Sequence, residues 1–179
     1  MNVLVVSGSR RRGSLNTRLA RLVATLRPAD AVHVVTDLTR LPFYDADTEA
    51  AGVPGPVAEL RTAVQAADLL VLATPEYNGS VPGLLANALD WLSRPHRESV
   101  LQAKPVLVLS ASPSPSGGAR AATQLRAVLT RIGATVHPAG LSVPAAHSRL
   151  AAGNTDSQLV ADLTGLLTDA LDAPAQGAA

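Results

Sequence analysis

The sequence contains no cysteine and very few aromatic residues, and both shortages narrow what the protein can be. Without cysteine, the protein has no structural disulfide, no thiolate chemistry and no cysteine-ligated zinc site. A chain free of disulfides suits a reducing compartment, so we expect a cytoplasmic protein. Only four residues are aromatic, so the place of each is informative: Phe43, Tyr44, Tyr77 and Trp91.

Lysine is also scarce, and neither sign of charge dominates the chain. Lys104 is the single lysine, the arginines are scattered apart from the run Arg10 to Arg12, and the net charge is +1. This pattern does not indicate a nucleic-acid-binding surface. No apolar run reaches the length of a membrane span, and the apolar start at residues 1–7 is too short for the core of a signal peptide. We therefore expect neither membrane insertion nor export.

Two kinds of apolar pattern alternate along the sequence. Short continuous apolar runs predict buried strands, at residues 2–7, 31–36, 68–74, 105–111 and near 134–141. Apolar residues at helical spacing predict helices between and after them, within residues 15–26, 57–67, 81–92, 125–132 and 159–171. Five successive strand–helix units predict an α/β fold, a doubly wound five-stranded parallel sheet with helices on both faces.

The chain shows no repeat and no shift in composition that would mark a second domain. At 179 residues it is long enough to form one hydrophobic core without disulfide or metal support. We expect a single domain over residues 1–172 and a flexible C-terminal tail over residues 173–179. The longest loop, residues 37–56, is expected to be a lid or a subunit contact.

In a doubly wound sheet, the loops that follow the carboxyl ends of the strands meet at one edge, where ligands bind. Three of these loops are polar and rich in glycine or proline, at residues 7–16, 75–83 and 112–120. In the second loop, Tyr77 stands between Glu76 and Asn78. A ring in this place indicates a planar ligand, although Tyr77 could instead simply cover the edge of the sheet.

The first loop has the residues of a phosphate site. Residues 7–17 supply hydroxyls, an amide, three arginines and two glycines just where a helix begins. Free backbone amides and the helix dipole make such a helix start attractive to anions, although a plain serine or asparagine cap is the alternative. Gly8 and Gly13 have the spacing of a P-loop, but Ser14-Leu15 replaces its lysine, and the dinucleotide pattern of three glycines also fails. A terminal phosphate, as in flavin mononucleotide, fits what remains.

Together, these segments resemble the NADPH-dependent FMN reductase family, and the resemblance covers nearly the whole chain. The segments that carry it are Gly8-Ser9-Arg10 with Ser14 and Asn16, residues 41–45, residues 75–83 with residues 87–91, and residues 117–120. The sequence Pro-Glu-Tyr-Asn-Gly-Ser at residues 75–80 is its specific part, whereas the glycine pair at 117–118 alone is not.

The resemblance implies a flavodoxin-like fold with strand order 2-1-3-4-5 and noncovalently bound FMN. It implies that the FMN phosphate is held by Ser9, Arg10, Ser14, Asn16 and Thr17. It further implies that the isoalloxazine ring lies along Pro75, Glu76, Tyr77 and Asn78. The loop after the fourth strand would border the ring from the other side, through Ser112, Gly117 and Gly118.

The implied activity is that of an NAD(P)H-dependent FMN reductase. Hydride passes from NADPH or NADH to flavin N5, and the electrons go on to a small acceptor: free flavin, a quinone, an azo compound or a metal ion. Because the flavin carries the chemistry, we expect no catalytic side chain. We also expect no metal site, because the four histidines lack ligand spacing.

Two other functions compete with this one. A flavodoxin-type electron carrier would bind FMN without oxidising NADPH itself, but such carriers dock through a strongly acidic face, and a net charge of +1 argues against that. A nucleotide-binding phosphotransferase lacks its P-loop lysine.

Two finer hypotheses concern the nucleotide and the assembly. Arg11 or Arg12 could select NADPH over NADH by meeting the 2′-phosphate, or both could be merely solvated. The resemblance implies a homodimer or a dimer-of-dimers homotetramer. Trp91 lies off the main apolar stripe of its helix, which predicts either a subunit contact or packing under a loop of its own subunit.

Overall fold

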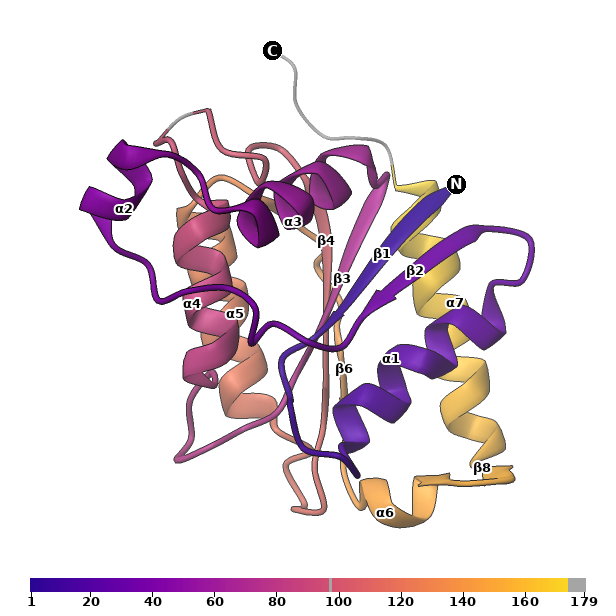
Figure 1. Ribbon diagram of the computed structural model, residues 1–179. Coiled ribbons are helices and arrows are strands. Elements are labelled where there is room, and N and C mark those ends of the chain that lie inside the picture. The colour runs from indigo at the N-terminus through magenta and orange to yellow at the C-terminus, as the bar shows by residue number, and fades with distance from the viewer. Residues whose placement is uncertain (97, 174–179) are drawn as a thin grey trace.

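A parallel β-sheet forms the centre of the molecule (Figure 1). The computed structural model describes residues 1–96 and 98–173. The sheet has the strand order β2-β1-β3-β4-β5, formed by Ala31–Val35, Asn2–Ser7, Leu69–Thr74, Pro105–Ala111 and Thr135–Val136. The predicted fold class and strand order are therefore confirmed.

Helices cover both faces of the sheet, as Figure 1 shows. The helices α1 (Leu15–Leu26) and α7 (Ser157–Asp172) pack on one face. The helices α3 (Gly55–Ala66), α4 (Gly83–Leu92) and α5 (Ala119–Arg131) pack on the other. Successive side chains of a strand point alternately into the two cores. Each central strand is therefore buried on both faces and needs apolar residues at consecutive positions, not only at every second position.

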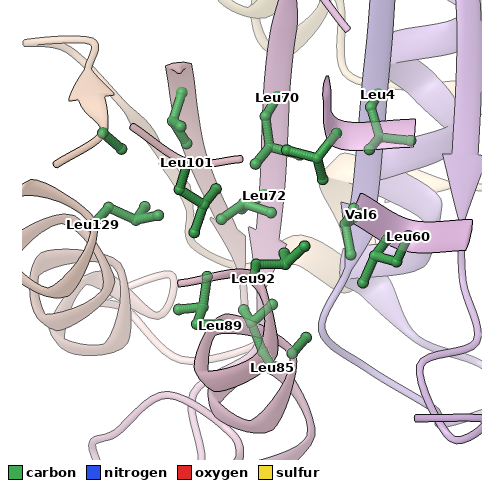
Figure 2. Packing of buried hydrophobic residues seen from close by; sticks show 14 of the residues in the cluster. Leu4, Val6, Leu60, Leu70, Leu72, Leu85, Leu89, Leu92, Leu101 and Leu129 are labelled. Atoms are coloured by element: carbon green, nitrogen blue, oxygen red, sulfur yellow. The ribbon is translucent and has the colours of Figure 1, made fainter. Parts of the chain in front are cut away.

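Strand β3 shows this most clearly, because all six of its residues are buried. Leu70 and Leu72 point into the core that contains Leu85 and Leu89 of α4 (Figure 2). Leu69 and Val71 belong to the opposite core, under α1 and α7. Each fully buried leucine stabilises the fold by about 1.5–3 kcal/mol.

The fifth predicted strand, near residues 134–141, is split into two short pieces. Both β5 and β6 (Leu141–Val143) pair with β4 in parallel. Between them, Pro138 has no N–H to donate to β4. The carbonyls of Pro138 and Ala139 instead accept hydrogen bonds from the Arg126 guanidinium, at 2.8 and 3.3 Å. Gly140 then passes so close to β4 that an added Cβ would lie 2.8 Å from the Val108 carbonyl oxygen.

The apolar pattern does not reveal four short elements. These are α2 (Ala46–Ala51), α6 (Ala146–Arg149), β7 (Leu150–Ala151) and β8 (Asn154–Thr155). Helix α2 has no buried residue, so it has no apolar stripe to detect. The other three are too short for any periodicity to be measured.

Trp91 is not a subunit contact, and that interpretation is wrong. Its side chain is fully buried, and its indole Nε1 donates to the Pro42 carbonyl at 2.8 Å. Its ring meets Tyr44 edge-on, with 5.0 Å between centroids and an interplanar angle of 81°. Trp91 therefore packs under the 37–56 loop of its own subunit, which was the alternative.

Asn87 attaches the same loop to α4. Its Oδ1 accepts from the Tyr44 backbone N–H at 2.8 Å, and its Nδ2 donates to the Pro42 carbonyl at 2.9 Å. This part of the loop therefore packs against α4 in the structure.

Two of the predictions concern the C-terminal tail and membrane insertion. Apart from Ala173, the tail expected over residues 173–179 lies outside the described residues. Among the helices that the structure describes, none combines the length and the apolarity that crossing a membrane requires.

The close approach of Gly140 to β4 can be tested against a second glycine. We expect Gly140→Ala to lower the free energy of unfolding by about 1–3 kcal/mol, because the new methyl group collides with backbone. Gly165 lies inside α7 with nothing within 4 Å of an added Cβ. Gly165→Ala should therefore stabilise the protein by about 0.5–1 kcal/mol. Urea unfolding measures both, and a stable Gly140→Ala variant would show that the β5–β6 break does not depend on this contact.

Candidate functional site

A pocket lies where β1, β3 and β4 end, at the edge predicted to bind the ligand. Three loops contribute its lining, which consists of Ser9, Arg11, Ser14, Leu15, Asn16, Pro75, Glu76, Tyr77, Ala111, Ser112 and Pro113. Parallel strands bring their carboxyl ends together, so segments about 100 residues apart in sequence share one site.

The first loop places polar groups around the start of α1. Ser9 and Ser14 are both only 4% exposed. The Ser14 hydroxyl caps the helix by accepting from the Thr17 backbone N–H at 3.1 Å. Within the described part of the chain, the backbone amides of Leu15 and Asn16 have no acceptor. With no acidic residue in the first turn, this helix end favours a bound anion.

Asn16 fixes the start of α1 to the end of β4. Its Oδ1 accepts from the Ala111 backbone N–H, and its Nδ2 donates to the Ala111 carbonyl, both at 2.9 Å. The side chain is 2% exposed. Its amide group is thus committed to the protein's own backbone. Thr17 is similarly occupied, because its hydroxyl lies 2.9 Å from that of Ser7.

The three loop arginines point to different places. All three are exposed, and of the three only Arg11 lines the pocket. Arg10 lies near Asp37: hydrogen bonds from Thr39, together with the charges of Arg10 and Arg40, hold the pKa of the Asp37 carboxyl below its usual range. Arg10 is therefore directed toward the end of β2 rather than into the pocket.

The second loop is a tight turn. Tyr77 and Ser80 exchange backbone hydrogen bonds of 3.2 and 3.0 Å. Asn78 and Gly79 between them have φ values of 54° and 75°, the left-handed pair that this kind of two-residue turn requires. Tyr77 is 52% exposed, so it does not seal the edge of the sheet.

Two side chains fix this turn to α5. The Glu76 Oε2 accepts from the backbone N–H groups of Arg120 and Ala121, at 3.1 and 3.3 Å. The Gln124 Oε1 accepts from the Ser80 hydroxyl at 2.8 Å and from the Val81 N–H at 2.9 Å. Glu76 therefore caps a neighbouring helix, a role that its sequence position does not reveal.

The third loop needs its two glycines for packing. Gly117 has φ 62°, and an added Cβ would lie 2.7 Å from backbone atoms of Val143 and Pro144. Gly118 has φ 88° and lies beside Ser110 and Glu76. Neither lines the pocket, whereas the nearby Ser112 does.

The sequence-based list of site residues also missed several that line the pocket. Arg11, Leu15, Ala111 and Pro113 contribute to it, although from the sequence Arg11 is a candidate only for the 2′-phosphate of NADPH. Leu15 and Ala111 belong to the apolar patterns of a helix and a strand, which give no sign of contact with a ligand. Pro113 belongs to the proline-rich run at 112–116, which was the available signal.

Comparison with known proteins identifies the family. The family model described as NADPH-dependent FMN reductase matches residues 1–148. The chain belongs to the NADPH-dependent FMN reductase family. The protein is accordingly an FMN-dependent oxidoreductase that uses NAD(P)H as its hydride donor. This decides against the electron carrier and the phosphotransferase.

Individual members of the family and related structures agree. A quinone reductase of Escherichia coli is 41% identical over 138 residues, which are 76% of this chain and 73% of that protein. An NAD(P)H-dependent FMN reductase of Pseudomonas aeruginosa is also 41% identical, over 77% of this chain and 73% of that protein. The flavoenzyme NAD(P)H:(acceptor) oxidoreductase FerB from Paracoccus denitrificans has a TM-score of 0.84 at 30% identity, covering 96% of this chain and 95% of that one.

The Asn16 contacts predict an effect on stability that needs no flavin. Asn16→Leu leaves the N–H and carbonyl of Ala111 without partners, so the flavin-free protein should lose about 2–4 kcal/mol of unfolding free energy. Chemical unfolding of flavin-free protein measures this. The control is Arg21→Gln on the exposed face of α1, which should change stability by less than about 0.5 kcal/mol. If both variants unfold like wild type, Asn16 does not hold the helix to the sheet.

Proposed function

We propose that the pocket between the three loops is the FMN site of this reductase. The observation that carries the proposal is that buried serines, free helix amides and an arginine line one part of this pocket, while residues 75–77 of the second loop line another. The first part offers hydrogen-bond donors and positive charge, as a phosphate requires. The residues present therefore fit the group that the family uses.

The phosphate contacts differ from those implied by the sequence. We assign them to the hydroxyls of Ser9 and Ser14, the free amides of Leu15 and Asn16, and the Arg11 guanidinium. The Asn16 and Thr17 side chains are occupied by Ala111 and Ser7, so they act by holding the loop in place. Arg10 contributes positive charge from a distance.

The ring is assigned to the other end of the pocket. Pro75 and Tyr77 on one loop and Ser112 on another border this end, and the turn exposes backbone groups there. The Glu76 carboxylate is held by α5, so we assign any contact of Glu76 with the ring to its backbone. Asn78, Gly117 and Gly118 shape the two loops through their left-handed backbone.

When bound, FMN accepts hydride from NAD(P)H and passes electrons to the acceptor. The chain's residues bind and orient, and none is assigned as a general acid or base. Among the four predicted acceptor classes we favour quinones, because several relatives are named quinone reductase. Arg12, exposed beside the pocket, is the residue we assign to the 2′-phosphate of NADPH.

Assembly and location extend the proposal. With Trp91 buried, Phe43 becomes the aromatic residue we assign to a homodimer contact, within a dimer or a dimer of dimers. It is 87% exposed, next to a loop segment fixed to α4. The absence of cysteine supports a cytoplasmic location.

The proposed phosphate end predicts how the protein distinguishes two flavins. Riboflavin lacks the phosphate, so it should bind at least about 100-fold more weakly than FMN. Arg11→Ala should weaken FMN binding about 10-fold and leave riboflavin binding unchanged. The dissociation constant of riboflavin divided by that of FMN should therefore fall about 10-fold. Flavin fluorescence titration measures both constants.

Arg131→Ala is the control, because Arg131 lies at the far end of α5 and its replacement should leave both constants at their wild-type values.

Purified protein should be yellow and lose its flavin absorption on addition of NADPH alone. Equal affinities for riboflavin and FMN would remove the phosphate assignment, and failure to load any flavin would remove the site.

The proposed assembly predicts the effect of changing Phe43. Wild type should sediment as a dimer or larger species, and Phe43→Ser should shift it toward monomer. Val53, also an exposed apolar residue of the 37–56 loop, gives the matched control Val53→Ser, which should sediment as wild type. A monomeric wild type would refute the proposed dimer.

A further inference from the structure

The charges of this protein are segregated along the chain, although the net charge is only +1. Residues 1–29 contain six arginines and no acidic residue. The remaining 150 residues contain nine basic and fourteen acidic residues, a net charge of −5. Positive charge is thus concentrated in the first loop and in α1 with its C-cap, Arg27, and this loop and the start of α1 line the pocket.

Two of these arginines lie on the outer side of α1. Arg18 and Arg21 follow the cap Ser14 by four and seven residues, so all three lie on one side of the helix. At about 1.5 Å per residue, Arg21 stands about 10 Å along the helix from Ser14. Both arginines line a groove of about 290 Å³ between α1 and residues 150–155.

Little in the protein neutralises this basic face, defined by Arg18 and Arg21. Arg18 donates only a long bond of 3.4 Å to the Leu150 carbonyl. Asp156, which follows residues 150–155, pairs with Arg149 at 3.1 Å, and Asp30, which follows α1, pairs with Arg27 at 2.6 Å. Among the described residues, no ion pair includes Arg18 or Arg21.

FMN itself would use part of the local positive charge. Its phosphate carries about two negative charges, which offset positive charge of the loop arginines. Arg18 and Arg21 then remain as uncompensated charge on the helix whose start lines the pocket. Arg21 stands about 10 Å along α1 from Ser14, roughly one Debye length at 0.1 M salt.

We propose that the basic face of α1 draws anionic electron acceptors to the reduced enzyme, so that anions are favoured over neutral or cationic acceptors of similar reactivity. The inference rests on the proposed flavin site. Charged walls of one sign raise the local concentration and the association rate of oppositely charged substrates by about 10- to 1,000-fold in strong cases. NADPH is also an anion, so the oxidative half-reaction must be measured by itself.

Three acceptors of different charge isolate the effect. The enzyme is loaded with FMN and reduced under anaerobic conditions. In a stopped-flow instrument it is then mixed with one of three acceptors: ferricyanide, a trianion; 1,4-benzoquinone, which is neutral; or hexaammineruthenium(III), a trication. The two electrons of the enzyme reduce two metal complexes, releasing protons to solvent, or reduce one quinone, which also takes up two protons. Second-order rate constants are taken from about 0.01 M to about 1 M salt, a range that shortens the Debye length from about 30 to about 3 Å.

The variants are Arg21→Gln and Arg21→Glu, with Arg131→Gln and Arg131→Glu as matched controls. Arg131 carries the same charge and is also exposed, but it ends α5, thirteen residues long, at the opposite end from the site. At low salt, Arg21→Glu should slow the trianion about 3- to 10-fold, leave the quinone unchanged and speed the trication. The Arg131 variants should change these rate constants less than the Arg21 variants do, because Arg131 is farther from the site, and all differences should fade at high salt.

The outcomes separate this inference from the proposed function. Slowing of all three acceptors alike would identify Arg21 as a structural residue and overturn the inference. Equal salt dependence in the Arg21 and Arg131 variants would overturn it as well. Enzyme that binds no FMN, or that NADPH cannot reduce, overturns the proposed function and this inference with it. Enzyme that reduces normally but ignores acceptor charge overturns the inference alone.

Discussion

Burial of the central strands on both faces is the constraint on which the rest of the structure depends. It demands continuous apolar strands, and the helical crossovers between successive strands make them pair in parallel between two layers of helices. Parallel pairing then sends every carboxyl end to the same edge. The loops after β1, β3 and β4 meet there because of the sheet and not because of any attraction between them. The pocket is thus a consequence of topology, and its chemistry is a consequence of which residues follow each strand.

The polar residues at this edge divide into two groups. The side chains of the first group form hydrogen bonds within the protein and join each loop to a neighbouring strand or helix. This group consists of Asn16, Thr17, Glu76 and Gln124. Ser9, Ser14 and Arg11 keep hydrogen-bonding capacity or charge directed at the pocket. The first group makes the second effective, because a donor aids binding only when its loop is held in position.

The sequence alone predicts the sheet, its main helices and the edge of the sheet at which the pocket lies, since apolar periodicity and loop position carry that information. It does not separate residues that bind from residues that position. Asn16 and Glu76 are residue types that often contact ligands, and they stand in the expected loops. Their actual partners, Ala111 and the start of α5, lie 95 and about 45 residues away in the sequence. Trp91 is ambiguous for the same reason, because only the folded chain brings Pro42 and Tyr44 over its ring. The split of the fifth strand depends on Gly140 meeting Val108, again a contact between distant segments.

The bond pair between Asn16 and Ala111 has a consequence for how the protein acquires its cofactor. The two walls that it joins are held together by hydrogen bonds within the chain, and the Glu76 and Gln124 contacts hold the turn in the same way. At the proposed FMN site, flavin entry would therefore not have to order these segments, and flavin departure would not release them. A receptor assembled in advance in this way can exchange its flavin repeatedly while the sheet stays intact, which is what a protein needs if the same molecule serves first as cofactor and then as product.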